Sequence, residues 1–175
     1  SILRSIPTPV LNQKDNNQVI ITSIGDDAIY CQLIKSSVYI QQLISNIPKG
    51  DLFKHRGMYV DKADKKKMYL VFDRKQKNWF RARLERLNDG DSHVMNYVDH
   101  GYKAMVKVED IYRLDKVSIV LFFYPPQVLK FGLFNVQLNS DVKKRLLALL
   151  PCGREALVSN LIRNFSSKCY QKGYR

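Results

Sequence analysis

The sequence predicts an α+β protein, mostly β with helices, in which a small barrel is inserted between two outer segments. Three observations lead to this fold class. Short alternating strands separated by turn signals fill residues 68–108, a hairpin and a helix precede them, and a strand and helices follow them. Each outer segment is too small to bury a core alone, so we expect the two segments to pack together.

The first outer segment begins with "SILRSIPTPV", which predicts an extended arm because proline disfavours helix in the residue before it. Residues 18–34, "QVIITSIGDDAIYCQLI", are typical of a hairpin, since apolar residues run up to a "GDD" turn and resume after it. The next segment predicts a helix that begins at Ser36 or Ser37 as cap and ends at Pro48. Its expected buried face is Ile40, Leu43, Ile44 and Ile47.

The middle of the chain predicts four short strands and a helical turn. The strands are "MYLVF" (68–72), "NWFRARLERL" (78–87), "SHVMNYVD" (92–99) and "YKAMVKV" (102–108). In the second strand, Phe80, Ala82 and Leu84 alternate with Trp79, Arg81 and Arg83, so the two sets should face opposite sides. The segment "EDIYRL" resembles a single helical turn. Four short strands at this spacing indicate a small, strongly bent barrel.

The second outer segment predicts strands and two helices. The apolar run "VSIVLFFY" (117–124) suits a buried strand, and "VLKFGLFNV" (128–136) alternates as a strand. Residues 139–150 predict a helix capped near Asn139 or Ser140, with Val142, Leu146, Leu149 and Leu150 on one face. Residues 154–165 predict a second helix, with Leu157, Leu161, Ile162 and Phe165 facing inward.

The composition argues against several classes of protein. No apolar run approaches the roughly 18 residues of a membrane span, so we expect no membrane partner. The cysteines Cys31, Cys152 and Cys169 are too far apart for a metal motif and suit buried free thiols in a reducing compartment. The histidines form no metal motif, and no set of carboxylates with a positioned arginine can be assembled. We therefore expect no enzyme activity, no metal and no cofactor.

The net charge is +13, which usually indicates an acidic partner such as nucleic acid. Residues 54–86 hold twelve Lys and Arg against four Asp and Glu. Most such runs are solvated hairpin tips, but they can also bind phosphate. An RNA-binding module is therefore the alternative function, with possible contacts at Lys65, Lys66, Lys67, Lys75 and Lys77.

Four motifs in this order resemble the extended Tudor domain over roughly residues 18–150. They are "NWFRARLERL", "NYVDHGYKAMV", "VEDIYRL" and "YPPQVLKFGLFNV". The resemblance implies a Tudor β-barrel at residues 51–120, inserted into an OB-type lobe similar to staphylococcal nuclease. A helix joins the barrel to the lobe. That lobe would be split between residues 1–50 and 121–175. Because helix and tail replace the family's last strands, the lobe is expected to be incomplete or rebuilt there.

The resemblance also implies a binding site. Family members hold dimethylated arginine in an aromatic cage, where ring faces attract the cation. The cage positions fall on Phe72, Phe80, Tyr97, His100 and Tyr102. His100 stands where the family has tyrosine, and Tyr102 stands where it has an asparagine, so the cage is degenerate. Arg81 and Asp99 are expected to pair across strands and to orient the pocket without touching the ligand.

The resemblance implies a non-catalytic module of a piRNA-pathway scaffold that binds the arginine-rich N-terminal tail of a Piwi-class Argonaute. Because the cage is degenerate, the expected tail is unmethylated. Weak methylarginine binding and a pure scaffold role are the other outcomes. The implied location is cytoplasmic, in perinuclear germ granules (nuage). Since the protein and such a tail are both basic, acids near the pocket are expected to supply a local negative field: Asp89, Asp91, Asp99, Glu109 and Asp110. Asp26 and Asp27 belong to the other lobe and are expected to line the cleft between the lobes.

Overall fold

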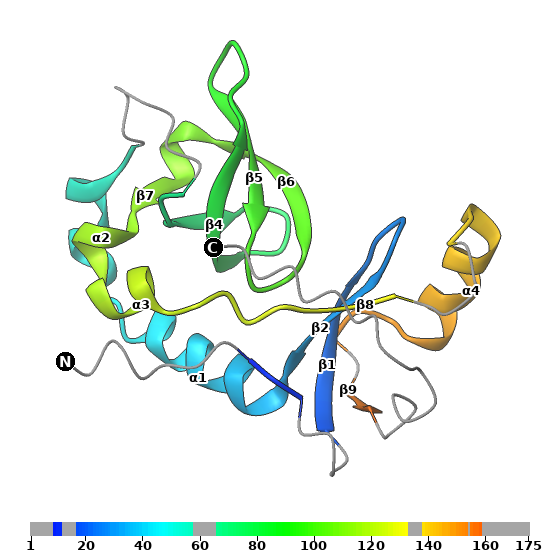
Figure 1. Ribbon diagram of the computed structural model, residues 1–175. Coiled ribbons are helices and arrows are strands. Elements are labelled where there is room, and N and C mark those ends of the chain that lie inside the picture. The colour runs from blue at the N-terminus through cyan, green and yellow to red at the C-terminus, as the bar shows by residue number, and fades with distance from the viewer. Residues whose placement is uncertain (1–8, 12–16, 58–65, 133–137, 154, 159–175) are drawn as a thin grey trace.

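The computed structural model describes residues 9–11, 17–57, 66–132, 138–153 and 155–158. They form two antiparallel sheets with helices between and beside them (Figure 1). One sheet has the strand order β8-β2-β1-β9 and the other the order β6-β5-β4-β3-β7. The first sheet combines strands from both ends of the chain, so the second sheet is an insertion within it, as the sequence predicts.

The four-stranded sheet contains β1 (Asn17–Ile24), β2 (Ile29–Leu33), β8 (Leu129–Phe131) and β9 (Glu155–Val158). Its helix is α4 (Ser140–Leu149). The predicted hairpin is confirmed as β1 and β2, which pair antiparallel. Val19, Ile21 and Ile24 of β1 form a small core with Cys31, against which Leu146 of α4 and Leu150 directly after it pack.

The five-stranded sheet curves into the barrel that the sequence predicts. Its strands are β3 (Tyr69–Asp73), β4 (Asn78–Arg86), β5 (Ser92–Tyr97), β6 (Tyr102–Lys107) and β7 (Ile111–Arg113). Two 3₁₀ helices flank them, η2 (Lys49–His55) and η3 (Val108–Asp110). The predicted helical turn at 109–114 is thus shorter than expected, because Ile111 to Arg113 pair with β3 as a fifth strand.

Three helices join the two sheets: α1 (Ile34–Ser45), α2 (Leu114–Val117) and α3 (Ile119–Phe123). They cover the outer face of β3 and β4, where Leu70 meets Ile40, Ile44 and Leu121 in a shared core. The sequence predicted a cap at Ser36 or Ser37 for the first helix, but α1 begins at Ile34 without a side-chain cap. The helix starts early because β2 runs directly into it with no linker.

Two predicted elements are wrong in type. The apolar run 117–124 forms the end of α2 and then α3 instead of a buried strand, with the Ser118 hydroxyl accepting from the Leu121 amide at 3.3 Å. The helix predicted at 154–165 is also wrong where it is described, because Glu155–Val158 forms β9 and pairs with β1. An open strand edge offers unpaired backbone groups, and pairing with it outweighs the local helical pattern. The rest of that predicted helix lies outside the described residues.

Two predicted elements of the second outer segment are confirmed in part. The strand predicted at 128–136 is present as β8, while residues 133–137 lie outside the described part of the chain. The helix predicted at 139–150 is present as α4, capped by Asn139, whose side chain accepts from the Val142 amide at 2.9 Å. No residue of α4 is fully buried, and Leu149 is 66% exposed, so its apolar face covers the sheet only partly.

Candidate functional site: the turn between β5 and β6 and its aromatic pocket

The turn at residues 98–101, which joins β5 to β6, is held by a buried ion pair. Arg81 of β4 donates from Nε to Asp99 Oδ2 at 2.8 Å and from Nη2 to Asp99 Oδ1 at 2.6 Å. Both side chains are almost fully buried. This is the pair that the sequence predicted, and its two parallel bonds give it a defined geometry.

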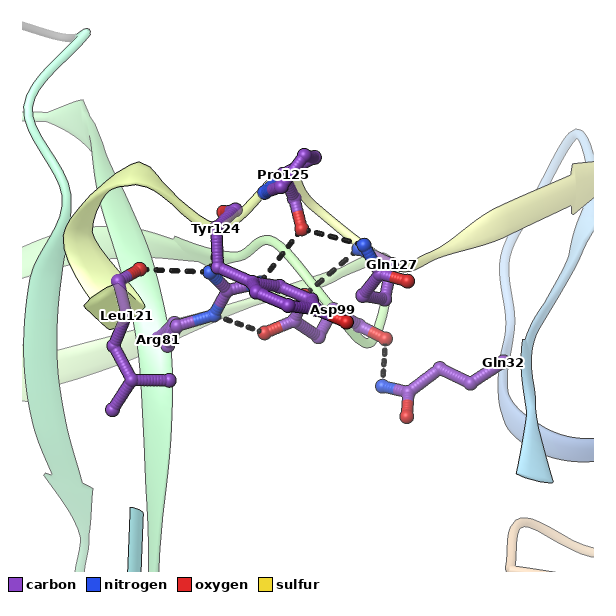
Figure 2. Close-up of polar contacts among 7 residues, drawn as sticks. All are labelled: Gln32, Arg81, Asp99, Leu121, Tyr124, Pro125 and Gln127. Carbon is purple, nitrogen blue, oxygen red and sulfur yellow. Dashed lines mark hydrogen bonds and ion pairs between the residues drawn. The ribbon is translucent and has the colours of Figure 1, made fainter. Parts of the chain in front are cut away.

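The remaining donors of Arg81 bind backbone carbonyls of α3 and of the segment that follows it (Figure 2). Nη1 donates to the carbonyls of Leu121 at 2.9 Å and Tyr124 at 2.6 Å, and Nη2 donates to Pro125 at 3.0 Å. A guanidinium has five N–H groups, and all five are used here. Arg81 therefore has no donor left for a ligand and acts as a positioning residue.

Asp99 extends the same network toward the other sheet. Its Oδ1 also accepts from the Gln127 amide at 2.9 Å, and its backbone carbonyl accepts from the side chain of Gln32 of β2 (Figure 2). The turn between β5 and β6 is thus tied to β4, to the segment after α3 and to the four-stranded sheet at a single residue.

The four-stranded sheet contacts the turn at two further positions. The His100 carbonyl accepts from the hydroxyls of Thr22 and Ser23 of β1, both at 2.9 Å. Gly101 has a φ of +76° and packs so closely on Tyr30 of β2 that a Cβ would lie 2.2 Å from the ring. Only glycine fits this conformation at this distance.

Four of the five predicted cage residues are brought together, from β4, β5, the turn and β6. The rings of Phe80 and Tyr97 stack with centroids 4.7 Å apart and an interplanar angle of 8°. The His100 ring meets Phe80 edge-on at 4.8 Å, and the Tyr102 ring meets Tyr97 edge-on at 4.9 Å. Phe80 and Tyr97 are buried, so the outer faces of His100 and Tyr102 close the pocket.

The fifth predicted cage residue, Phe72, lies elsewhere. Its ring packs on Trp79 at 5.0 Å, while Tyr69 and Val71 of the same strand point into the barrel core. The next residue in that inward register is Asp73, whose Oδ2 accepts from the Tyr97 hydroxyl at 2.9 Å. Asp73 is absent from the predicted site residues, because alternation within β3 places it opposite Phe72 without fixing which side faces inward.

Asp73 also shapes the turn after β3. Its Oδ1 accepts from the backbone amides of Lys75 at 2.9 Å and Gln76 at 3.0 Å. This places the Gln76 side chain so that it hydrogen-bonds the Tyr102 hydroxyl. The turn between β3 and β4 therefore holds Tyr102 over the pocket.

Burial favours the uncharged forms of the titratable side chains in the pocket. Burial raises the pKa of Tyr102 to about 12. Burial, and then the hydrogen bond to Asp73, also raises the pKa of Tyr97. Burial lowers the pKa of His100, whose Nδ1 is buried without a hydrogen-bond partner among the described residues. An uncharged His100 does not repel an approaching cation.

The acids expected to form a negative field or to line the cleft are mostly paired with cations of the same chain. Arg74 binds both Glu109 and Asp110, Lys143 binds Asp26 at 2.7 Å, and Lys130 binds Asp27 at 2.5 Å. Asp99 is neutralised by Arg81. Asp26 and Asp27 lie at the tip of the β1–β2 hairpin, in the sheet that contacts the turn. Their carboxylates are exposed.

The lysines considered for RNA binding do not form one patch. Lys75 and Lys77 lie in the turn after β3, whereas Lys66 and Lys67 precede β3 at its other end. A five-residue strand spans roughly 17 Å, which separates the two groups. Lys65 lies outside the described residues.

Cysteine and metal chemistry contribute little to the site. Burial raises the pKa of the Cys31 thiol to about 12, so Cys31 is a buried free thiol as predicted. Cys152 is a free thiol but is exposed, contrary to the prediction, and Cys169 lies outside the described residues. Within the described part of the chain, no cluster of His, Cys, Asp and Glu could hold a metal, and no helix could span a membrane.

The fold and the turn motif define the class of protein. The Tudor domain family matches residues 11–135, and the chain belongs to this family. No curated protein sequence matches the chain.

Solved structures of extended Tudor domains share the fold, which confirms the resemblance seen in the sequence. The human TDRD1 extended Tudor domain, in complex with a symmetrically dimethylated peptide, superimposes with a TM-score of 0.68 at 15% identity. That match covers 87% of this chain and 76% of that chain. The extended Tudor domain of Drosophila melanogaster Tudor-SN has a TM-score of 0.64 at 16% identity and covers 82% and 67%.

A point mutant of the Drosophila melanogaster Papi extended Tudor domain is also similar. Its complex with a methylated Piwi N-terminal peptide has a TM-score of 0.67 at 15% identity, covering 82% of this chain and 74% of that chain. Its complex with the unmethylated Piwi N-terminal peptide has a TM-score of 0.65 at 14% identity, with the same coverage. This Papi mutant has therefore been solved with the Piwi peptide in both methylation states.

Replacing Arg81 by alanine should be strongly destabilising, because it leaves the Asp99 carboxylate buried and unpaired. We expect a loss of about 3–5 kcal/mol in the free energy of unfolding, measured by urea denaturation. Arg81→Lys should recover little of this, since an ammonium cannot reproduce the two parallel bonds and the three carbonyl contacts. Full stability of Arg81→Lys would contradict this account of the network.

His100 should make the protein less stable as the pH falls. Its pKa is lowered in the folded state, so the unfolded state binds more protons below about pH 6.5, and stability decreases as pH falls through that value. The negative charge of Asp99 raises the pKa of His100, and the positive charge of Arg81 lowers it further. Urea denaturation between pH 7.5 and 5.5 should show a slope for the wild type, up to roughly 1.4 kcal/mol per pH unit, that is reduced in His100→Gln. Parallel curves for the two proteins would rule out this role.

Proposed function

We propose that this Tudor domain is a non-catalytic module that binds the arginine-rich N-terminal tail of a Piwi-class Argonaute in its unmethylated form. It would serve a piRNA-pathway scaffold in cytoplasmic, perinuclear germ granules. The family and the peptide complexes of similar structures support the class of ligand. The preference for the unmethylated form rests on the geometry of the aromatic pocket.

The observation that carries this preference is the stack of Phe80 on Tyr97. A guanidinium held between two rings needs a separation of roughly 7 Å, one contact of about 3.5 Å on each side. The two ring centroids are 4.7 Å apart and their planes are nearly parallel. The two rings therefore leave no slot between them for a guanidinium in either methylation state, and Tyr102 and His100 pack against their edges, so the cage that would favour methylarginine is closed.

Unmethylated arginine suits the surface beside the closed pocket. Free guanidinium offers five donors and binds carboxylates with two parallel bonds, and methylation removes donors. Asp26 and Asp27 are exposed at the tip of the β1–β2 hairpin, and their pairs with Lys143 and Lys130 are also exposed. Exposed ion pairs contribute little, so an arginine of the tail can replace a lysine of the protein.

The basic net charge weakens the attraction for a basic tail but does not prevent binding. Charges farther than about 8 Å are largely screened at physiological salt, so the local carboxylates count most. The same net charge favours RNA as the second candidate function. The separation of the two lysine groups speaks against one continuous RNA-binding patch.

Calorimetric titration with an arginine-rich Argonaute tail, unmethylated and symmetrically dimethylated, tests the proposal at two salt concentrations. We expect the unmethylated tail to bind more tightly than the dimethylated tail. The double variant Asp26→Asn/Asp27→Asn should weaken the affinity for the unmethylated tail by about tenfold or more. Asp51→Asn removes an equally exposed carboxylate from η2 and should leave the affinity unchanged. Tighter binding of the methylated tail would overturn the proposal, and steeply salt-dependent binding of RNA alone would favour the second candidate.

Replacing Tyr102 by asparagine should open the pocket, because it removes both the covering ring and its bond to Gln76. Exposing the face of Tyr97 should raise the affinity for the dimethylated tail by about three- to thirtyfold, the value of one ring in a cation–π contact. The matched control is Gln76→Ala, which frees the hydroxyl of Tyr102 but keeps its ring, and should give a smaller gain. An unchanged preference in Tyr102→Asn would show that Tyr102 does not exclude methylarginine.

A further inference from the structure

The helix α3 has no polar side. Its five residues are all apolar, so burying Leu121 in the core leaves other large side chains outside. Phe122 packs partly against the same core, while Ile119, Val120 and Phe123 are 52%, 37% and 55% exposed. A helix that is apolar all round is normally covered on every side.

The helix α1 lies beside α3 (Figure 1). Tyr39 of α1 packs on Tyr124, directly after α3, with ring centroids 5.6 Å apart. Val38 and Tyr39 are themselves 49% and 45% exposed. We call the five side chains Val38, Tyr39, Ile119, Val120 and Phe123 the α1–α3 face. Contiguous apolar surfaces of this kind mark binding sites more often than single exposed residues do.

Two exposed lysines, Lys35 and Lys116, lie next to the α1–α3 face in the chain. The α1 helix contains no acidic residue, and Lys35 lies one helical turn before Val38 and Tyr39. Lys116 precedes Ile119, and both lysines are exposed and form no ion pair with a described residue. The neighbouring acid, Asp115, is bonded to Arg113. The rim therefore complements an acidic partner.

The backbone of this face limits the conformation of a partner. The α1 helix uses most of its amides and carbonyls internally. At α3, the Phe122 and Tyr124 amides donate to carbonyls one turn earlier, and the Leu121 and Tyr124 carbonyls accept from Arg81, so neither helix offers an edge for an added strand. An apolar segment that binds here must satisfy its own backbone hydrogen bonds, as a helix does. The face is also preorganised, because the carbonyls of Leu121 and Tyr124 are bonded to the buried Arg81.

We propose that the α1–α3 face is a docking surface for an amphipathic helix with acidic flanks from another protein. A second copy of this chain fits less well, since a symmetric contact would bring the same lysines together between two molecules of charge +13. An anionic membrane also fits less well, because such binding relies on clusters of about four to eight basic residues near the bilayer.

The test uses three designed helical peptides of about 18 residues, long enough to form a stable amphipathic helix. One has leucine at i, i+3, i+4 and i+7 with glutamate elsewhere, the second replaces glutamate by lysine, and the third is a scramble of the first. We expect fluorescence anisotropy to show binding of the acidic peptide at least about tenfold tighter than either control. Equal binding of the acidic and lysine peptides, or no binding of the acidic one, would overturn the proposal.

Variants locate the binding. Ile119→Ser/Phe123→Ser should reduce affinity for the acidic peptide by about tenfold or more, as loss of buried aromatic anchors does. Lys35→Glu/Lys116→Glu should shift the preference toward the lysine peptide. Leu87→Ser, at an equally exposed leucine after β4, is the control and should bind as the wild type does. Loss of binding in the control variant, or retention in the first, would place the peptide elsewhere and reject this face.

Two further measurements test whether a membrane or a second copy of the chain binds to the α1–α3 face instead. Phosphatidylserine vesicles sedimented with the protein test the membrane, and sedimentation velocity over a range of concentrations tests self-association. If the acidic peptide does not bind, and Ile119→Ser/Phe123→Ser abolishes vesicle binding or self-association, the proposed partner is wrong. The membrane or a second copy of the chain would then be the partner. Melting temperatures near that of the wild type show that the variants are folded, since the substituted side chains are exposed.

Discussion

The structure depends on one buried ion pair, Arg81 with Asp99. Burying two charges is costly, and the cost is offset only when the remaining donors and acceptors are satisfied. Arg81 meets this requirement by binding three carbonyls in and directly after α3, and Asp99 by accepting from the backbone amide of Gln127. The barrel can therefore place Arg81 only if the returning chain lies against it, which couples the two sheets.

This coupling positions the pocket. With Asp99 held, the turn presents the His100 carbonyl to β1 and brings Gly101 onto Tyr30. The chain then enters β6 with Tyr102 against Tyr97. The pocket is closed by neighbours in space that come from β3, β4, β5 and β6, so its shape is a property of the whole barrel.

The distribution of charge bears on the proposal that this basic domain binds a basic peptide. Many carboxylates form ion pairs with cations of the same chain, such as Asp110 with Arg74. The exposed carboxylates of Asp26 and Asp27 lie together at the tip of the β1–β2 hairpin. The positive charge is spread over separate places, including the rim of the α1–α3 face. Tails, nucleic acid and acidic helices would therefore meet different parts of one surface, with local pairs rather than net charge selecting each partner.

The sequence by itself determined the parts of the fold that depend on local alternation. The hairpin, the four central strands and the Arg81–Asp99 pair follow from residue types at a period of two and from a compact turn motif. Only the tertiary structure decided the rest. Residues 119–123 carry no periodicity that separates strand from helix, and Glu155–Val158 became a strand because β1 had an open edge. Phe72 faces outward and Asp73 inward because the register of β3 is set by its pairing with β4 and β7, which involves residues far away in the chain.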